Sequence, residues 1–215
     1  VAHDLRSPLN AISVNAQLLE QQHSRALGDA GMTALRRMSA AVRRMTEILD
    51  RLLGLSIVSH ATFRREHVDL TELMRDIFEE LAASEPPPPV VFTVGELPDA
   101  NADPTLVRTL ATNLLSNALK YTRSREERRI DVGCENRDGA PVYFVRDNGI
   151  GFDNRSAERL FHAFERLGRD GGSEEGIGLG LNIAVRVVRR HNGRIWAESR
   201  PGQGAAFYFT LGPGP

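Results

Sequence analysis

The sequence predicts an α+β protein in two parts: an antiparallel helical hairpin, which is half of a dimeric four-helix bundle, and an α/β sandwich after it. Apolar residues recur at alternating spacings of three and four through the first 58 residues, as in packed helices. Beyond residue 60, short strand-like segments mix with helical ones, which favours a mixed sheet with helices on one face. Because the pattern changes near residues 59–63, we expect domains at residues 1–60 and 61–215.

The hairpin is expected from two apolar stripes with a turn between them. We predict helices over residues 1–22 and 31–58, a turn over 23–31, and a bend at Pro8 because proline removes a backbone donor. The stripes comprise Ala2, Leu5, Leu9, Ile12, Ala16 and Leu19 in the first helix, and Leu35, Met38, Val42, Met45, Leu49 and Leu52 in the second. One hairpin cannot cover both stripes well, so we predict a homodimer through residues 1–58.

The second domain begins with a short strand in residues 65–70. Asp69 and Glu72 form a capping-box pattern that predicts the start of the next helix. We then expect helices at 70–83, 104–121 and 178–192, strands at 90–94, 129–136, 141–147, 193–199 and 205–211, and a short helix with a polar loop within 152–175.

Composition excludes several classes of function. The chain has 215 residues, and its net charge of −1 is not segregated, so we expect no nucleic-acid partner and no direct membrane contact. The single cysteine excludes an internal disulfide and fits a reducing compartment, and no run of 18 apolar residues occurs. We therefore expect a cytoplasmic location. The chain begins at Val1 without a signal-peptide pattern, so we expect a fragment of a longer protein.

Three segments of the second domain carry candidate chemistry. In "NLLSNALKYT", Asn113 and Asn117 are four residues apart and share one helix face, with Lys120 and Tyr121 one turn further on. Taken alone, such an asparagine pair is more often solvated or capping.

The second segment, "DNGIGF", follows a predicted strand. Asp147 can accept a hydrogen bond at the strand's end, while Gly149 and Gly151 let the backbone turn close to a flat ligand. An isolated Asp-Asn-Gly is more often an ordinary turn.

The third segment, "GIGLGL", covers Gly176 to Leu181 and opens a predicted helix. Closely spaced glycines at a helix N-terminus expose backbone N–H groups that suit a polyphosphate. A dinucleotide-binding fingerprint is excluded because a loop, not a strand, precedes these glycines.

Taken together, the three segments resemble the N, G1 and G2 boxes of sensor histidine kinases of two-component systems. "LFHAFERL" resembles the F box through Phe161 and Phe164, whose alternative interpretation is plain core packing, and "VAHDLRSPLN" resembles the H box. The resemblance covers essentially the whole chain in the family's order. The wording "RDNGIGFD" and "HNGRIWAES" is similar to phytochrome-type and hybrid kinases. The resemblance to sensor histidine kinases implies that the second domain is an ATP-binding sandwich of the GHKL ATPase and kinase type.

The resemblance also implies roles for single residues. Asp147 takes the adenine amino group, Asn117 binds Mg²⁺, and Asn113 supports that metal site. Lys120 and Tyr121 reach the phosphates of ATP. The remaining nucleotide-binding positions are Gly149, Gly151, Phe161, Phe164, Gly176, Gly178, Leu179, Gly180 and Leu181, and residues 165–177 form a mobile lid.

His3 is the implied nucleophile, with Asp4 as the base that orients its ring. Together with Asn113 they are the expected catalytic residues. The implied reaction is ATP-dependent autophosphorylation of His3, followed by transfer to an aspartate in the receiver domain of a response regulator. Ser7 stands where relatives that also act as phosphatases usually carry threonine or asparagine, which leaves that activity open.

Two alternatives belong to other functional classes. One is a dimeric scaffold without catalysis, which the intact boxes disfavour. The other is a GHKL-type ATPase such as a type II topoisomerase domain or the ninety-kilodalton heat-shock chaperone. Those relatives carry a glutamate that activates water four residues before the metal-binding asparagine. Asn113 occupies that position here and cannot act as a base.

Overall fold

The computed structural model describes residues 2–60, 62–161 and 180–212, and in the first helix it describes the side chains of residues 7–49 except Arg25 and Glu47. These residues divide into two compact units, one built on the long helical segment α1 (Ala2–His60) and the other on the rest of the chain. No helix in these ranges combines the length and apolar character that a bilayer crossing needs.

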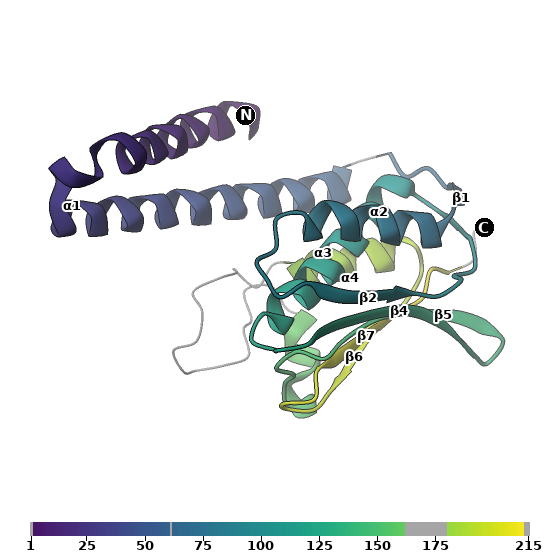
Figure 1. The fold of residues 1–215 in the computed structure, drawn as a ribbon. Coiled ribbons are helices and arrows are strands. Elements are labelled where there is room, and N and C mark those ends of the chain that lie inside the picture. The colour runs from purple at the N-terminus through teal and green to yellow at the C-terminus, as the bar shows by residue number, and fades with distance from the viewer. Residues whose placement is uncertain (1, 61, 162–179, 213–215) are drawn as a thin grey trace. The chain divides into compact units, whose positions relative to one another are not determined.

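The first unit is a helical hairpin that reverses at one residue. Figure 1 shows the two halves of α1 running antiparallel, and Glu20 and Arg36 pair across them with 3.7 Å between Oε1 and Nε. Gly28, with φ 60° and ψ −178°, is the one described residue in α1 outside helical geometry. The prediction of a turn across residues 23–31 is therefore wrong in extent, because this backbone region, open almost only to glycine, reverses the chain in one step. Pro8 lies within helical backbone.

The hairpin covers only alternate residues of each apolar stripe. Leu9 and Ala16 from the first half are buried, as are Leu35 and Val42 from the second. The intervening stripe residues are between 41% and 55% exposed, namely Ile12, Leu19, Met38 and Met45. A single chain therefore leaves a row of large apolar side chains open to solvent.

In the second unit, helices lie over one face of a sheet (Figure 1). Its strands are β2 (Val90–Val94), β4 (Arg128–Arg137), β5 (Ala140–Asp147), β6 (Ile195–Ser199) and β7 (Ala205–Phe209), in the order β2-β4-β5-β7-β6. Only the β2–β4 pair is parallel. The helices are α2 (Leu70–Ala82), α3 (Pro104–Thr122) and α4 (Gly180–Arg190). The predicted mixed sheet with helices on one face is confirmed.

The expected strand near residue 66 belongs to a second, smaller sheet. β1 (Glu66–Val68) pairs antiparallel with β3 (Ala100–Ala102), a three-residue strand that the sequence pattern does not predict. The capping prediction is confirmed, since the Asp69 carboxylate accepts from the Glu72 N–H at 2.9 Å at the start of α2. Residues 152–161 hold two short 3₁₀ helices, η1 (Asn154–Ser156) and η2 (Glu158–Phe161).

The face of the sheet away from the helices carries aromatic and arginine side chains. Tyr208 is only 4% exposed and stacks on Trp196, with 5.4 Å between the ring centroids. The Arg137 guanidinium carbon lies 4.6 Å from the Tyr208 ring centroid and 5.7 Å from that of Trp196. These cation–π contacts shield apolar surface that none of the described helices covers.

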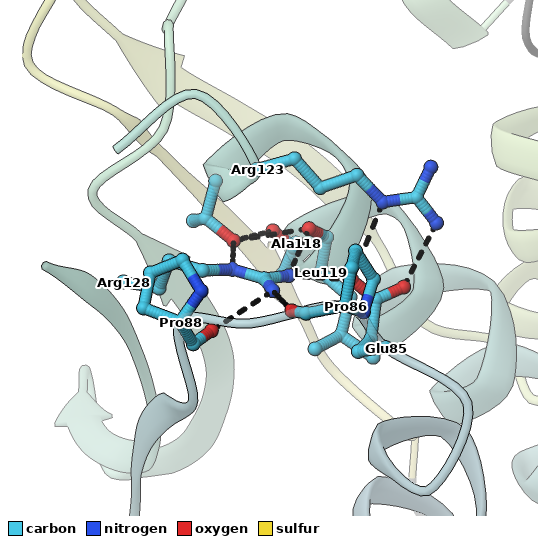
Figure 2. Close-up of polar contacts among 8 residues, drawn as sticks. Glu85, Pro86, Pro88, Ala118, Leu119, Arg123 and Arg128 are labelled. Carbon is cyan, nitrogen blue, oxygen red and sulfur yellow. Dashed lines mark hydrogen bonds and ion pairs between the residues drawn. The ribbon is translucent and has the colours of Figure 1, made fainter. Parts of the chain in front are cut away.

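A buried arginine fixes the C-terminal end of α3. Arg128, at the start of β4, is 1% exposed and donates to Glu85 Oε2 at 2.6 Å and to the Leu119 carbonyl at 2.8 Å, as Figure 2 shows. The carbonyls of Pro86 and Pro88 accept from its Nη1. Hydrogen bonding to Arg123, and then to Arg128, holds the pKa of Glu85 below its usual value. The segment after α2, the end of α3 and β4 are thereby held together.

Candidate functional site

The N-terminus of α3 is held by a buried polar cluster. The Asp103 carboxylate caps the helix by accepting from the Leu106 N–H at 3.0 Å, and its other oxygen accepts from the Arg64 N–H at 3.0 Å. His191 Nε2 accepts from the Asp103 N–H at 3.0 Å, so its Nδ1 carries the proton and donates to the Val187 carbonyl at 2.8 Å. Burial lowers the pKa of His191, which favours this neutral form. The helix is thus fixed at its start as well as at its end.

The predicted polar residues of α3 share one side of the helix. Asn113 and Asn117 are half-buried, and the Asn113 amide donates to the Thr109 carbonyl at 2.7 Å. Lys120 Nζ lies 5.2 Å from the ring centroid of Tyr121, which is 42% exposed. The row therefore begins with two amides and ends with a cation beside an accessible phenol.

Asp147 ends β5 and is 6% exposed. In the strand register it lies opposite Ile130 and Ala205, on the face that carries the core. Its Oδ1 accepts from the Gly149 N–H at 2.8 Å, and the Ala205 amide also donates to the carboxylate. Burial raises the pKa of Asp147 to about 6, against the opposing effect of the two amides and of the Arg125 charge. A buried carboxylate fixed by amides is well suited to accept a hydrogen bond from a ligand.

The turn after Asp147 is packed on two sides. The Tyr121 carbonyl accepts from the Ile150 N–H at 3.2 Å, and the Ile150 carbonyl accepts from the Gly202 N–H at 2.7 Å. Gly151 has φ +62°, and a Cβ there would meet the carbonyl oxygens of Arg200 and Gly204. Glycine at this position is therefore required by both conformation and space.

The same turn is joined to β4 through Asn148. Its Oδ1 accepts from the Arg129 N–H at 2.9 Å, and its Nδ2 donates to the Glu127 carbonyl at 2.8 Å. The asparagine of "DNG" thus serves the fold directly.

The structure brings three of the predicted segments together. α3, with its asparagines, packs against both β5, which ends at Asp147, and α4, which begins at Gly180 and Leu181. Phe161 ends η2 half-buried, and its carbonyl accepts from the amide of Asn182 on α4 at 3.4 Å. Phe164, Gly176, Gly178, Leu179 and the expected lid at 165–177 lie outside the described residues.

The expected nucleophile lies at the other end of the chain. His3 and Asp4 belong to the first turns of α1, and their side chains lie outside the described part. Among the described residues, no group of three or more His, Cys, Asp or Glu side chains is placed to hold a metal ion.

Sequence reasoning missed the residues that support the Asp147 turn. Arg125 donates to the carbonyls of Gly149 and Gly202, and Ser199 Oγ accepts from the Phe152 N–H at 2.8 Å. The one available signal was "PGQG" at residues 201–204, a turn between two predicted strands. Nothing in the sequence indicates that this turn lies against "DNGIGF".

Comparisons with known proteins agree with this arrangement. The family described as "Histidine kinase-, DNA gyrase B-, and HSP90-like ATPase" matches residues 102–215, and the "His Kinase A (phospho-acceptor) domain" matches residues 1–60. Cyanobacterial phytochrome B of a Nostoc species is 31% identical over 212 residues, covering 98% of this chain and 28% of that protein. The adaptive-response sensory kinase SasA of a Synechocystis species is 32% identical over 221 residues, covering 98% of this chain and 57% of that protein.

Among solved structures, full-length ShkA in complex with AMPPNP shares the fold with a TM-score of 0.68 at 24% identity, covering 98% of this chain and 44% of that one. The chain spans 28% and 57% of the lengths of the two relatives above. One family model matches more than half of the chain, and a second matches the hairpin that precedes it. The chain therefore belongs to the histidine kinase-, DNA gyrase B- and HSP90-like ATPase family, and its first 60 residues match the phospho-acceptor domain of histidine kinases.

Proposed function

We propose that this chain uses ATP to phosphorylate His3 and then passes the phosphoryl group to an aspartate of a response regulator. Residues 1–60 would be the dimerisation and phosphotransfer domain, and residues 61–215 the ATP-binding domain. The observation that carries the proposal is the buried Asp147 carboxylate, fixed by two amides at the end of a strand that packs against the asparagine-bearing helix α3.

The base of the nucleotide would be recognised by Asp147. An adenine amino group donates hydrogen bonds, and a carboxylate whose remaining lone pairs are kept from water is a strong acceptor for it. Gly149 and Gly151 would act by letting the turn pack closely against neighbouring carbonyls, which holds the Gly149 N–H on the Asp147 carboxylate. ShkA, which shares the fold, forms a complex with AMPPNP, and this supports nucleotide binding by the chain.

The phosphates would lie along α3 and the start of α4. Asn117 would provide an oxygen ligand for Mg²⁺, Asn113 would support it, and Lys120 and Tyr121 would contact phosphate oxygens. When bound, Mg²⁺ neutralises phosphate charge and keeps the transferred group in line with its acceptor. Gly176, Gly178, Leu179, Gly180 and Leu181 would donate backbone N–H groups, and Phe161 and Phe164 would line the same region.

His3 would act through its neutral imidazole. Nε2 forms a bond to the γ-phosphorus while the bond to the bridging oxygen of ADP breaks, and ADP leaves with the bond electrons. The ring is then cationic, and Asp4 would stabilise it and take the Nδ1 proton. The amide of Asn113 cannot remove a proton from water, which supports transfer to the protein over ATP hydrolysis.

A labelling experiment tests this function. We expect acid-labile incorporation from γ-labelled ATP into the wild type and none into His3→Ala, which still binds nucleotide. His23→Ala is the matched control because His23 is an exposed histidine of the same helical unit, and its labelling should equal that of the wild type. Labelling that persists in His3→Ala refutes the assignment. Nucleotide binding without labelling supports the scaffold alternative, and ATP turnover without labelling supports the ATPase.

The partner at the hairpin would be a second copy of this chain. The exposed stripe residues, among them Met38 and Met45, give the unit an apolar surface that a four-helix bundle would bury. We expect Met38→Lys with Met45→Lys to shift the protein from dimer to monomer in light scattering. Ala40→Lys, which adds charge on the opposite side of the same helix, should leave a dimer. A wild type that is monomeric at all concentrations contradicts the dimer.

A further inference from the structure

One arginine outside the sequence motifs supports the turn that follows Asp147. Arg125 lies between α3 and β4, where its N–H donates to the Thr122 carbonyl at 2.9 Å. Its Nη2 donates to the Gly149 carbonyl at 2.7 Å and to the Gly202 carbonyl at 2.6 Å. One nitrogen thus joins the turn after β5 to the turn between β6 and β7.

This contact acts on the same residue that fixes the Asp147 carboxylate. Gly149 donates its N–H to Asp147 Oδ1 and presents its carbonyl to Arg125, so a shift of Arg125 moves the amide that orients the carboxylate. Gly202 in turn donates to the Ile150 carbonyl. The guanidinium therefore completes a set of bonds around residues 149–151.

Arg125 holds this position at a cost. Its Nε is buried and has no hydrogen-bond partner among the described residues. An unpaired buried donor destabilises a fold by about 1–3 kcal/mol. The two carbonyl contacts and the charge near Asp147 are the compensation that the structure offers.

We propose that Arg125 is a positioning residue for the purine base: it holds Gly149 so that Asp147 faces the exocyclic amino group of the nucleotide. This inference rests on the proposed function, since it concerns how that site binds ATP. Burial raises the pKa of Asp147. The Gly149 and Ala205 amides lower it, and the positive charge of Arg125 lowers it as well. Its loss would therefore disturb both the orientation and the ionisation of the carboxylate.

The test compares two ligands across pH. ATP and inorganic tripolyphosphate carry similar ionising phosphates, but only ATP has a base, so their difference isolates recognition of the base. Both affinities are measured by calorimetry with Mg²⁺ present, between pH 5.5 and 8.5, for wild type, Arg125→Gln, Arg125→Lys and Arg146→Gln. Arg146 is the matched control, because it precedes Asp147 directly but is 47% exposed and faces Glu135.

For Arg125→Gln we expect ATP binding to weaken about tenfold at pH 8, the equivalent of about 1.4 kcal/mol. The difference between the ATP and tripolyphosphate affinities should reach half of its full value, the midpoint, at a higher pH than in the wild type. The affinity for tripolyphosphate itself should stay unchanged. Arg125→Lys keeps the charge without the planar fork, so its ATP affinity should fall while its midpoint stays that of the wild type. Arg146→Gln should match the wild type throughout.

Three results overturn the proposal. The first is an Arg125→Gln protein that binds ATP as tightly as the wild type. The second is an equal loss of both ligands with no change of midpoint, which marks a purely structural role. If Arg125→Gln does not fold, Arg125→Lys decides, and wild-type ATP affinity in that variant overturns the proposal. A wild type that binds neither ligand refutes the proposed function itself, and the inference falls with it.

Discussion

Replacing Asp147 by asparagine is expected to change how the stability of the nucleotide-free protein depends on pH. The pKa of Asp147 is about 6 in the folded chain, against 3.8 for an ordinary aspartate, because the carboxyl group is buried. The folded state therefore binds a proton more tightly than the unfolded state. The contribution of Asp147 to wild-type stability therefore falls as pH rises from about 4 to about 6, and asparagine, which does not titrate, removes this contribution.

The size of the change follows from the two pKa values. A pKa raised from 3.8 to about 6 corresponds to about 3 kcal/mol between the fully protonated and fully ionised limits. Between pH 5 and pH 8 the linkage relation gives about 1.4 kcal/mol of this. The free energy of unfolding of Asp147→Asn, measured relative to wild type, should therefore increase by that amount from pH 5 to pH 8.

Urea unfolding provides the measurement, because the only tryptophan, Trp196, lies on β6 and reports on the second unit. The buried His191 has a lowered pKa, so its contribution rises with pH below about 6.5, in the opposite sense, but it is present in both proteins and cancels. The same variant should bind ATP more weakly. A stability difference that stays constant from pH 5 to pH 8 would refute our account of the Asp147 environment.

Two further predictions concern the fold. Arg128→Met should destabilise the second unit by about 3 kcal/mol or more in urea unfolding, because it leaves Glu85 and three carbonyls without their buried partner. Substitution of the exposed Arg123 by methionine should cost much less. Equal effects of the two substitutions would contradict this assignment. Gly28→Ala should destabilise the hairpin by about 1–3 kcal/mol, because alanine is strained at φ 60° and ψ −178°. Thermal unfolding followed by circular dichroism measures this change. An unchanged melting temperature would contradict a reversal of the chain at Gly28.

Local patterns predicted most elements of the fold. The Asp69 cap, the α3 helix and the strands β4 and β5 each follow from residues close in sequence, and each is confirmed. The failures also have local causes. β3 consists of Ala100, Asn101 and Ala102, none of which is a β-branched or aromatic residue of the kind that favours strands. The predicted turn over residues 23–31 was too long because the chain reverses at Gly28 alone.

The candidate site was predictable only where a motif marked it. Asp147, Asn113 and Asn117 stand in recognisable segments, and the structure places their elements in contact. Arg125 is one of 26 arginines, and its role depends on Gly202, which is 77 residues away in sequence and comes close only through the order of strands in the sheet. Contacts set by topology leave no trace in the spacing of residues.

Arg137, which lies over Tyr208 and Trp196, explains why the second unit needs only two layers, one sheet and the helices on one of its faces. A guanidinium group is flat and weakly hydrated, so it can rest on aromatic rings while its edges stay in water. A lysine ammonium, being compact and strongly hydrated, would leave much of the same area bare. The outer face of the sheet is therefore already shielded from water. The second unit can lie next to different neighbouring domains without needing any of them to cover this face.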